Sequence, residues 1–326
     1  MTKAIRMFKT GGPEVMEYVD VEVGDPGPGE VRIRHAAVGL NFIDVYFRIG
    51  LYPQPLPSGL GQEGAGTIEA VGAGVTDFKV GDRVAYAGRP NGAYAEARVM
   101  PADILVKLPD SISFDTAAAM MLQGMTVQYL LRQTYPLKGG ETILLHAAAG
   151  GIGLIACQWA KALGVTVIGT VSTDEKAAFA ARNGADHTIF YRREDVVART
   201  RELTKGRGVD LVLDHVCGPE FSGYLGALAK WGTLVSYNAF AGLPEDNLMA
   251  AMRNHLDICP AVRCFSFHIY DDDRDGRRAL MGEVIAALDR GEIRPAISAR
   301  FKLAEVRKAH TLLEQGAALG KIIMTP

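Results

Sequence analysis

Closely spaced glycines mark the segment of this chain where a chemical role is easiest to assign. The stretch His146-Ala-Ala-Ala-Gly-Gly-Ile-Gly153 follows an apolar run at 141–145 and precedes residues 154–163, whose apolar side chains recur at helical spacing. A glycine turn from a buried strand into a helix leaves backbone N–H groups at the positive end of that helix. The pattern is Ala-x-Gly-x-x-Gly, with Ala148 in the first glycine place of the dinucleotide fingerprint. Residues Gly150, Gly151, Ile152 and Gly153 are therefore predicted to cradle a pyrophosphate.

Alternating strand and helix patterns must position this turn. Strands are expected at 141–145, 165–171, 187–191, 209–216 and 233–237, and helices at 154–163, 174–182, 195–204 and 220–230. Strands that alternate with helices of about ten residues indicate an α/β domain with a parallel, doubly wound sheet. Such a sheet binds its ligand at the carboxyl ends of its strands.

The end of the second strand indicates which dinucleotide the sheet binds. NAD sites usually place an acidic residue there, about 20 residues after the glycines, to hold the ribose 2′-hydroxyl. Here the position is Val171, followed by Ser172 and Lys176, and Tyr191 ends the next strand beside two arginines. A neutral strand end with a lysine and hydroxyls nearby suits the 2′-phosphate of NADP. Two acidic residues at 174–175 oppose this, although the first turn of a helix favours them for its dipole alone.

Composition bounds the possible functions. The 326 residues, 48% of them hydrophobic, are enough for two domains, and the net charge of −2 with dispersed lysines and arginines favours neither nucleic acid nor an anionic membrane as a partner. No apolar run approaches the length of a transmembrane helix, and the amino-terminal residues lack the apolar core of a signal peptide. Four cysteines without metal-binding spacing suggest a reducing, cytoplasmic location.

The first third of the chain has a different pattern. Residues 1–124 contain short alternating strands broken by glycine and proline, which predicts a partly closed β-barrel. Residues 125–268 form the nucleotide-binding domain, and the tail, 269–326, is expected to return to the first domain. The cofactor is then expected in a cleft between domains. A strand-like segment, 257–267, is predicted to be an edge strand that pairs two copies of the chain.

These motifs resemble the medium-chain dehydrogenase/reductase superfamily over essentially the whole chain. Within it, the chain is most similar to the zinc-independent NADPH:quinone oxidoreductases, the zeta-crystallin-like group. The stretches that carry the resemblance are 11–15, 39–44, 48–53, 59–66, 81–84, 146–159 and 320–323. The resemblance implies a GroES-like β-barrel domain joined to a Rossmann domain, NADPH as cofactor, a quinone-like substrate and a homodimer.

The zinc ligands of related alcohol dehydrogenases have no equivalents here. Asn41 stands where those enzymes have a cysteine, Gln62 replaces the histidine of their Gly-His-Glu motif, and their third ligand falls near Leu122. The lobe with four closely spaced cysteines is also missing. Because a catalytic zinc needs three protein ligands, the sequence predicts no metal, and the expected reaction shifts toward reduction of an activated acceptor.

The resemblance also implies roles for individual residues. Asn41 is expected near the nicotinamide ribose or the acceptor oxygen, Tyr46 and Tyr52 are expected to line the acceptor pocket, and Arg48 is expected to stabilise negative charge on the reduced acceptor. The alternatives are a buried turn residue for Asn41, ordinary core packing for the tyrosines and a structural ion pair for Arg48. The cofactor-binding residues implied are Asn41, Tyr129, Gly150, Gly151, Ile152, Gly153, Ser172, Lys176, Tyr191, Val216, Ser236, Asn238, Phe240 and Lys321.

Three functions are compatible with these residues. The leading interpretation is zinc-independent transfer of hydride or electrons from NADPH to quinones, in which the cofactor carries the chemistry and the protein supplies position. A second is reduction of the C=C bond of an enone or enoyl thioester. A third is a non-catalytic, crystallin-like NADPH-binding protein.

Overall fold

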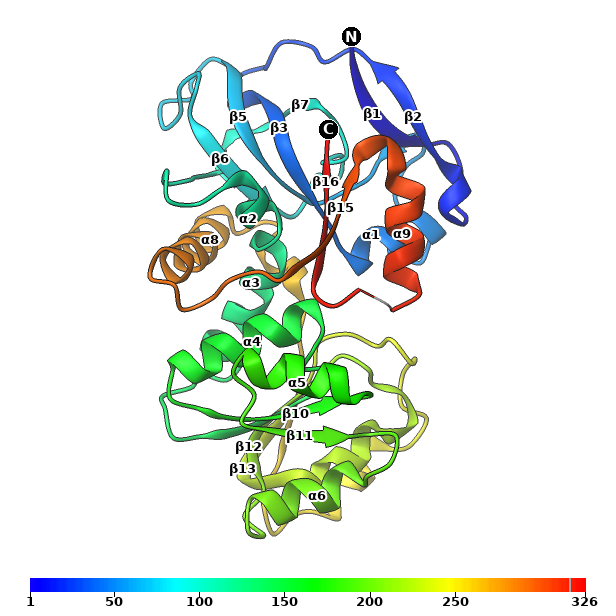
Figure 1. Ribbon diagram of the computed structural model, residues 1–326, viewed down its shortest axis with the longest axis vertical. Coiled ribbons are helices and arrows are strands. Elements are labelled where there is room, and N and C mark those ends of the chain that lie inside the picture. The colour runs from blue at the N-terminus through cyan, green and yellow to red at the C-terminus, as the bar shows by residue number, and fades with distance from the viewer. Residues whose placement is uncertain (317) are drawn as a thin grey trace. The chain divides into compact units, whose positions relative to one another are not determined.

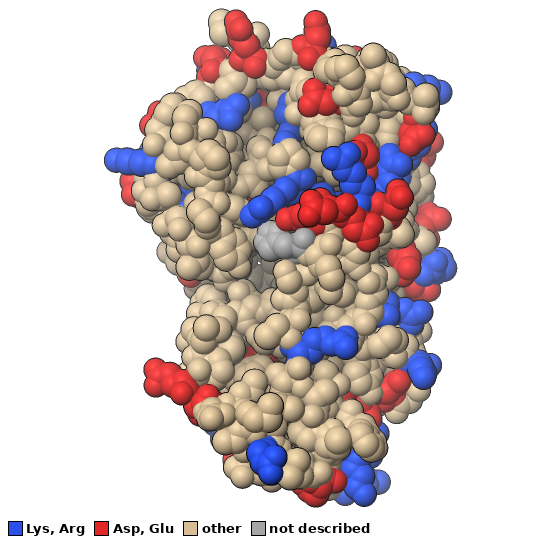
Figure 2. Space-filling view, turned by 180° about the vertical axis from the view of Figure 1, so that it is seen from behind, with Lys and Arg blue, Asp and Glu red and all other residues tan. Residues whose placement is uncertain are grey.

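The chain folds into two compact units, which the computed structural model describes over residues 1–316 and 318–326 (Figure 1). Unit 1 comprises residues 1–125 and 269–326, and unit 2 comprises residues 126–268. The chain leaves unit 1 within helix α3 (Met121–Tyr129). Among the residues so described, no helix has both the length and the apolar character that a membrane crossing requires. Acidic and basic side chains are interspersed on the face shown in Figure 2, in keeping with the small net charge.

Unit 2 is built on a parallel sheet with the strand order β11-β10-β9-β12-β13-β14. This is the order of a dinucleotide-binding sheet, so the predicted Rossmann fold is confirmed. Helices α4 and α5 lie on one face and α6 on the other (Figure 1). The elements are β9 (Thr142–Leu145), α4 (Gly151–Ala162), β10 (Thr166–Val171), α5 (Asp174–Arg182), β11 (His187–Phe190), α6 (Val196–Leu203), β12 (Val209–Asp214), β13 (Leu228–Ser236), α7 (Leu248–Arg253) and β14 (Ala261–Cys264).

Three predicted elements of unit 2 differ from the structure. The expected α-helix at 220–230 is a 3₁₀ helix, η4 (Gly218–Ala227), and strand β13 already begins at Leu228. Glycines within this segment and Pro219 at its start lower its α-helix propensity, which favours the tighter, irregular turn. The strand expected to run to Val216 ends at Asp214, and the segment expected to be strand-like from 257 to 267 pairs only over β14.

Unit 1 is built from two β-sheets around a shared core. One sheet has the order β2-β1-β4, and the other has the order β15-β16-β3-β5-β6-β8, with β7 also pairing with β3. The GroES-like β-domain is therefore confirmed as a fold. The carboxyl-terminal strand β16 pairs with β3 of this unit. The elements are β1 (Thr2–Met7), β2 (Met16–Val21), β3 (Glu30–Leu40), α1 (Phe42–Ile49), β4 (Ser58–Gly59), β5 (Glu63–Val71), β6 (Arg83–Ala87), β7 (Ala97–Pro101), β8 (Val106–Lys107), α2 (Phe114–Ala118), α8 (Arg274–Asp289), β15 (Ile297–Lys302), α9 (Val306–Glu314) and β16 (Lys321–Thr325).

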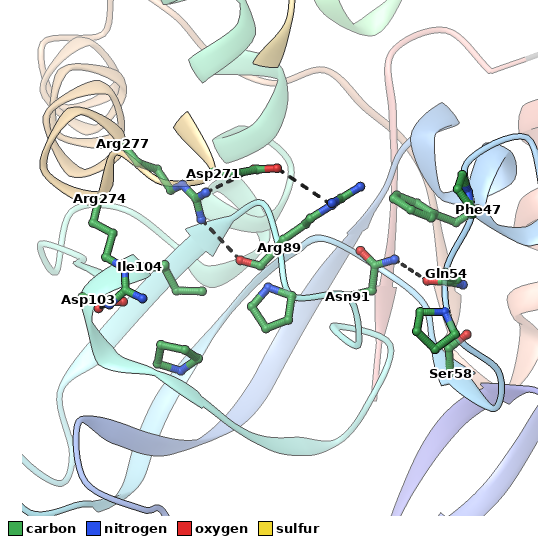
Figure 3. A pocket seen from close by; sticks show the side chains of 14 residues that line it. Phe47, Gln54, Ser58, Arg89, Asn91, Asp103, Ile104, Asp271, Arg274 and Arg277 are labelled. Carbon is green, nitrogen blue, oxygen red and sulfur yellow. Dashed lines mark hydrogen bonds and ion pairs between the residues drawn. The ribbon is translucent and has the colours of Figure 1, made fainter. Parts of the chain in front are cut away.

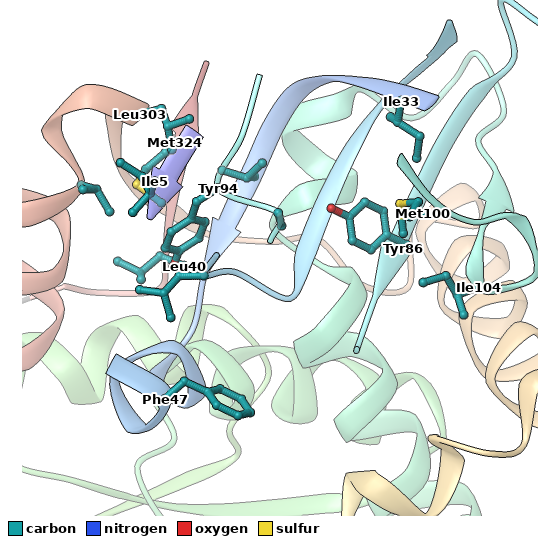
Figure 4. Close-up of a cluster of buried hydrophobic side chains, with 14 of the residues drawn as sticks. Ile5, Ile33, Leu40, Phe47, Tyr86, Tyr94, Met100, Ile104, Leu303 and Met324 are labelled. Carbon is teal, nitrogen blue, oxygen red and sulfur yellow. The ribbon is translucent and has the colours of Figure 1, made fainter. Parts of the chain in front are cut away.

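The core of unit 1 draws side chains from distant parts of the chain. Ile5, Ile33, Tyr94 and Met324 are each at most 1% exposed and belong to one apolar cluster (Figure 4). Burial of each large apolar side chain contributes about 2 kcal/mol before entropy losses are counted. This shared burial fixes the amino-terminal strands against the carboxyl-terminal strand β16.

A buried arginine joins helix α1 to helix α9. Arg48 has a side chain only 1% exposed, and its guanidinium donates to both carboxylate oxygens of Glu314, at 2.9 and 2.7 Å. It also donates to the carbonyl of Gly11 and to Nδ1 of His310. His310 thus accepts as a neutral ring, and burial lowers its pKa to about 3. The bidentate ion pair holds the two helices in register.

Removing the carboxylate from this pair should destabilise unit 1. We expect Glu314→Ala to lower the free energy of unfolding by about 2 kcal/mol, because it leaves the buried Arg48 guanidinium without a counter-charge. Chemical denaturation measures the loss. The control is Asp20→Ala, which removes the exposed ion pair with Lys3 and should cost less than about 1 kcal/mol. Equal losses in the two variants would contradict the structural role of Arg48.

Candidate functional site

The turn between β9 and α4 is shaped by contacts that exclude larger side chains. A Cβ on Gly153 would lie 2.3 Å from the carbonyl oxygen of Ala147, so only glycine fits. The first glycine place of the fingerprint holds Ala148, whose methyl group packs against Gly169 of β10. A Cβ on Gly169 would lie only 2.4 Å from that methyl group, so the glycine on the neighbouring strand makes room for the alanine. Helix α4 begins at Gly151, with Gly150 as its N-cap, so the amides of its first turn have no acceptor within the helix. This end of the helix can bind an anion.

The body of the turn is anchored by hydrogen bonds to β10. Ala147 has a left-handed φ of 52°, and its N–H donates to Oγ1 of Thr170 at 3.2 Å. The same hydroxyl lies 3.2 Å from Nδ1 of His146, a ring whose pKa burial lowers to about 3. The Ala148 N–H donates to the Thr170 carbonyl at 3.1 Å. One residue of the neighbouring strand therefore fixes the orientation of the glycine turn.

The residues expected to select the nucleotide lie together at one edge of the sheet. Ser172 directly follows β10 and Tyr191 directly follows β11, and the Tyr191 N–H donates to the Val171 carbonyl. Lys176 lies in the first turn of α5, whose N-cap Thr173 accepts from the Lys176 N–H. Tyr191 is 47% exposed. The arrangement is an open surface at the end of β10.

The negative charge of the acidic residues beside this surface is partly neutralised by a neighbouring arginine. Asp174 pairs with Arg193 at 3.1 Å, with both side chains exposed, and Glu175 also lies in the first turn of α5. The guanidinium of Arg192 lies 5.8 Å from the ring of Tyr191. Within the described residues, Lys176 and Arg192 make no ion pair with these carboxylates, so this edge can accept a phosphate.

The remaining cofactor residues predicted in unit 2 follow the next two strands. Val216 lies in the loop after β12, where its N–H donates to Oδ1 of Asp214 at 2.7 Å and its carbonyl accepts from the Ala241 N–H. Burial raises the pKa of Asp214 to about 6. The other three lie at the end of β13 and just after it. The Ser236 hydroxyl, on the last residue of β13, donates to the carbonyl of Asn238, whose side-chain oxygen accepts from the Ala239 N–H. Phe240 is 63% exposed. Tyr129, at the end of α3, packs its ring 4.7 Å from that of Phe265.

In unit 1, Asn41 belongs to a buried network with Glu63 and Lys321. Asn41 donates through Nδ2 to Oε2 of Glu63 at 2.8 Å and accepts at Oδ1 from Nζ of Lys321 at 2.6 Å. Lys321 also pairs with Glu63 at 2.6 Å, and the two side chains are 2% and 0% exposed. Glu63 further accepts from the Leu122 N–H. The sequence predicted Asn41 and Lys321 as cofactor residues but assigned no role to Glu63, which joins them.

A second buried carboxyl lies next to this network. Asp44 accepts from the Asn41 N–H at 2.9 Å and from the Tyr94 hydroxyl at 2.7 Å, which fixes the start of α1. Burial raises the pKa of Asp44 to about 7, although these two hydrogen bonds act in the opposite direction. Tyr94 loses its proton less readily than usual, because its burial and the Asp44 carboxylate raise its pKa.

The two tyrosines predicted to line the acceptor pocket are neighbours in space. The rings of Tyr46 and Tyr52 meet edge to face with centroids 5.5 Å apart, and both residues are half-buried. Burial raises the pKa of Tyr52. Arg48, the fourth predicted catalytic residue, makes the ion pair with Glu314 described above, so the structural alternative accounts for its contacts. A catalytic role for Arg48 stays a prediction.

Two of the three positions equivalent to zinc ligands hold amide side chains that already make hydrogen bonds, and the third is near Leu122. The Asn41 amide bonds with Glu63 and Lys321, and Gln62 donates through Nε2 to Oδ1 of Asn91 at 2.7 Å. Within the described part of the chain, no group of three or more His, Cys, Asp or Glu side chains is placed to hold a metal ion. Amide groups lack the charge and softness of thiolate or imidazole, so these residues do not fit a catalytic zinc.

Comparisons with known proteins agree with both units. Residues 27–110 match the family model described as the alcohol dehydrogenase GroES-like domain, and residues 151–272 match the one described as zinc-binding dehydrogenase. A quinone oxidoreductase of Pseudomonas aeruginosa is 50% identical, and a 2-haloacrylate reductase of a Burkholderia species is 39% identical. Each alignment spans all of this chain and at least 99% of the relative.

A solved structure of a quinone oxidoreductase is also similar to this chain over its full length. The crystal structure of Escherichia coli quinone oxidoreductase complexed with NADPH is 40% identical, covers 99% of this chain and all of its own, and has a TM-score of 0.93. Full-length matches at this identity show the family as well as the fold. This chain belongs to the quinone oxidoreductase family of the medium-chain dehydrogenase/reductase superfamily.

Proposed function

We propose that this protein oxidises NADPH and passes the reducing equivalents to quinones or similar activated acceptors without zinc. The glycine turn at the start of α4, at the carboxyl end of the central strand β9, carries the proposal because it provides a built anion site. The P. aeruginosa and E. coli relatives are quinone oxidoreductases, and the E. coli protein has been seen with NADPH. Free cysteines, two of them exposed, favour a cytoplasmic location.

The residues present fit NADPH. Amides of Gly151, Ile152 and Gly153 at the helix end are suited to the pyrophosphate, while Lys176 and Tyr191, with Ser172 beside them, are suited to the 2′-phosphate. When bound, the reduced nicotinamide supplies the hydride. We keep as proposed contacts the other predicted cofactor residues, which are Asn41, Tyr129, Val216, Ser236, Asn238, Phe240 and Lys321.

On the acceptor side, the protein needs little acid–base machinery. A quinone already carries electron-poor carbonyls, so its flat ring needs orientation and donors for the oxygen that gains charge. The half-buried rings of Tyr46 and Tyr52 can supply both. Burial raises the pKa of Tyr52, which makes its hydroxyl a donor rather than a base at neutral pH.

A second candidate function is reduction of a conjugated C=C bond, which the 2-haloacrylate reductase relative favours. The same hydride donor and a tyrosine proton donor would serve that reaction.

We also propose that two copies pair through the edge strand β14, which is last in the strand order of its sheet and mostly exposed.

The nucleotide preference tests the surface at the end of β10. We expect Lys176→Ala to raise the KM for NADPH about tenfold and leave the KM for NADH nearly unchanged, because only NADPH carries the 2′-phosphate. Steady-state kinetics with both nucleotides measure this. The control is Lys138→Ala, an exposed lysine that precedes β9 and so lies at the amino end of the strands. An equal effect on both nucleotides would contradict the assignment.

The acceptor class is tested by NADPH oxidation on protein dialysed against a metal chelator. We expect rapid turnover with 1,4-benzoquinone, slower turnover with NADH at the same concentration, and no gain when zinc is added, because amides occupy the ligand positions. Turnover confined to 2-chloroacrylate would favour the second function. NADPH binding without turnover of either acceptor would contradict both proposed reactions and indicate a non-catalytic protein.

Pairing through β14 is tested by light scattering. The protein should have twice the chain mass of 35.0 kDa. Cys264→Asp should give the mass of a single chain, because it places like charges at the paired edge. Cys259→Asp is the matched control, since that exposed cysteine lies outside β14. A monomeric unsubstituted protein would reject the dimer.

A further inference from the structure

A closed set of three contacts holds the side chain of Asn41. Its Nδ2 donates to Oε2 of Glu63 at 2.8 Å, and its Oδ1 accepts from Nζ of Lys321 at 2.6 Å. The same ammonium group donates to Oε2 of Glu63 at 2.6 Å, which closes the set. Asn41, Glu63 and Lys321 are 4%, 0% and 2% exposed. Each end of the Asn41 amide therefore meets a buried charge that matches it.

These two charges leave the Asn41 amide only one orientation. An ammonium group can only donate hydrogen bonds, and a carboxylate can only accept them. Turning the amide over would set its nitrogen against Lys321 and its oxygen against Glu63, so both hydrogen bonds would be lost. Among the hydrogen bonds of the described residues, Glu63 takes one N–H of the Asn41 amide. The second N–H is the donor that Asn41 can offer to a ligand.

The usual role of an asparagine at the start of a helix does not account for this arrangement. Asn41 is the N-cap of α1, and an asparagine there commonly accepts from a helix amide through its side-chain oxygen. Here that oxygen accepts from Lys321, and the Asp44 N–H bonds instead to the main-chain carbonyl of Asn41 at 3.1 Å. The side chain of Asn41 therefore serves the buried network rather than the helix.

Glu63 is itself held so that it cannot turn away from Asn41. Its other oxygen, Oε1, accepts from the Leu122 N–H in the first turn of α3 at 2.8 Å. Gly39 leaves the space for this carboxylate, since a Cβ there would lie 2.4 Å from Oε2. Because both oxygens are satisfied and the residue is 0% exposed, Glu63 acts through Asn41 rather than on a ligand.

From this geometry we propose that Glu63 is a positioning residue. Together with Lys321, it holds the remaining N–H of Asn41 as a donor for the acceptor oxygen that gains negative charge when hydride arrives. The ammonium group on the amide oxygen polarises the amide and strengthens that donor. A donor fixed before the reaction stabilises developing charge without reorganisation. The inference rests on the proposed NADPH:quinone activity and adds to it the residue that orients Asn41.

A double variant that reverses the amide without leaving an unpaired buried charge tests the proposal. In Glu63→Gln/Lys321→Met, the Leu122 N–H requires the oxygen of the new amide, so the NH₂ group of that amide faces Asn41 and turns its side chain over. The fold should persist, because neither charge remains. We expect the single-turnover rate constant for oxidation of bound NADPH by 1,4-benzoquinone to fall about tenfold, with the KM for NADPH changed less than about twofold.

Arg277→Met is the matched control, because it removes another buried charge from unit 1. Arg277, with a side chain 2% exposed, pairs with Asp271 and donates to the carbonyl of Arg89 beside a pocket of about 490 Å³ (Figure 3). None of these three is a predicted site residue. The control should lower stability and leave the single-turnover rate constant unchanged, since a first-order rate constant does not depend on the fraction of folded protein.

A double variant that keeps the single-turnover rate constant, or that loses affinity for NADPH instead of rate, would overturn the positioning role. Absence of turnover in the unsubstituted protein would contradict the proposed function instead, and the orientation of Asn41 is then decided by NMR. The two side-chain N–H signals of Asn41, identified by their loss in Asn41→Asp, should exchange slowly with solvent and shift in the double variant. Exchange as fast as that of the exposed Asn254 would show that the amide is not held.

Discussion

The Glu63–Lys321 pair joins segments that lie more than 250 positions apart in the chain. Both charges are almost completely buried, so each requires the other, because an unpaired charge in this interior would be strongly destabilising. Gly39 makes room for the pair, since a Cβ there would lie 2.4 Å from the Glu63 carboxylate. Strand β16 must therefore return to β3, and that return places Lys321 against Asn41 just as the chain enters α1.

The Glu63–Lys321 pair also fixes Asn41, one of the residues that stand where related alcohol dehydrogenases have zinc ligands. With Asn41 donating to one charge and accepting from the other, its amide is fixed without a metal. Gln62 is fixed in turn by Asn91. Residues 151–272 match a family model described as zinc-binding dehydrogenase. Asn41 and Gln62 lie outside that match and make hydrogen bonds with neutral and charged side chains. The chemistry supported is reduction of an acceptor that is already activated, which needs no Lewis acid.

Unit 2 depends on a different constraint, which is close approach of backbone. Gly153 and Gly169 remove the side chains that would separate α4 from the sheet, and Thr170 holds the turn between them. Ala148 in the first glycine place is compatible with this packing because Gly169 compensates for its methyl group. The fingerprint is thus satisfied jointly by Ala148 of the turn and Gly169 of β10 rather than by one position.

Local periodicity was enough to predict the Rossmann strands, helix α5 to the residue and the glycine turn, because their signals lie within a few neighbours along the chain. It failed at 220–230, where glycines and Pro219 produced a 3₁₀ helix, and it extended the segment around β14 too far. The predicted residues around Ser172, Lys176 and Tyr191 were brought together by parallel pairing of adjacent strands, which the pattern implied. By contrast, nothing local distinguishes Glu63 or Arg277 from a solvated charged residue. Both are buried. Only the tertiary structure decided this, because burial and the choice of a distant partner depend on how remote segments pack together.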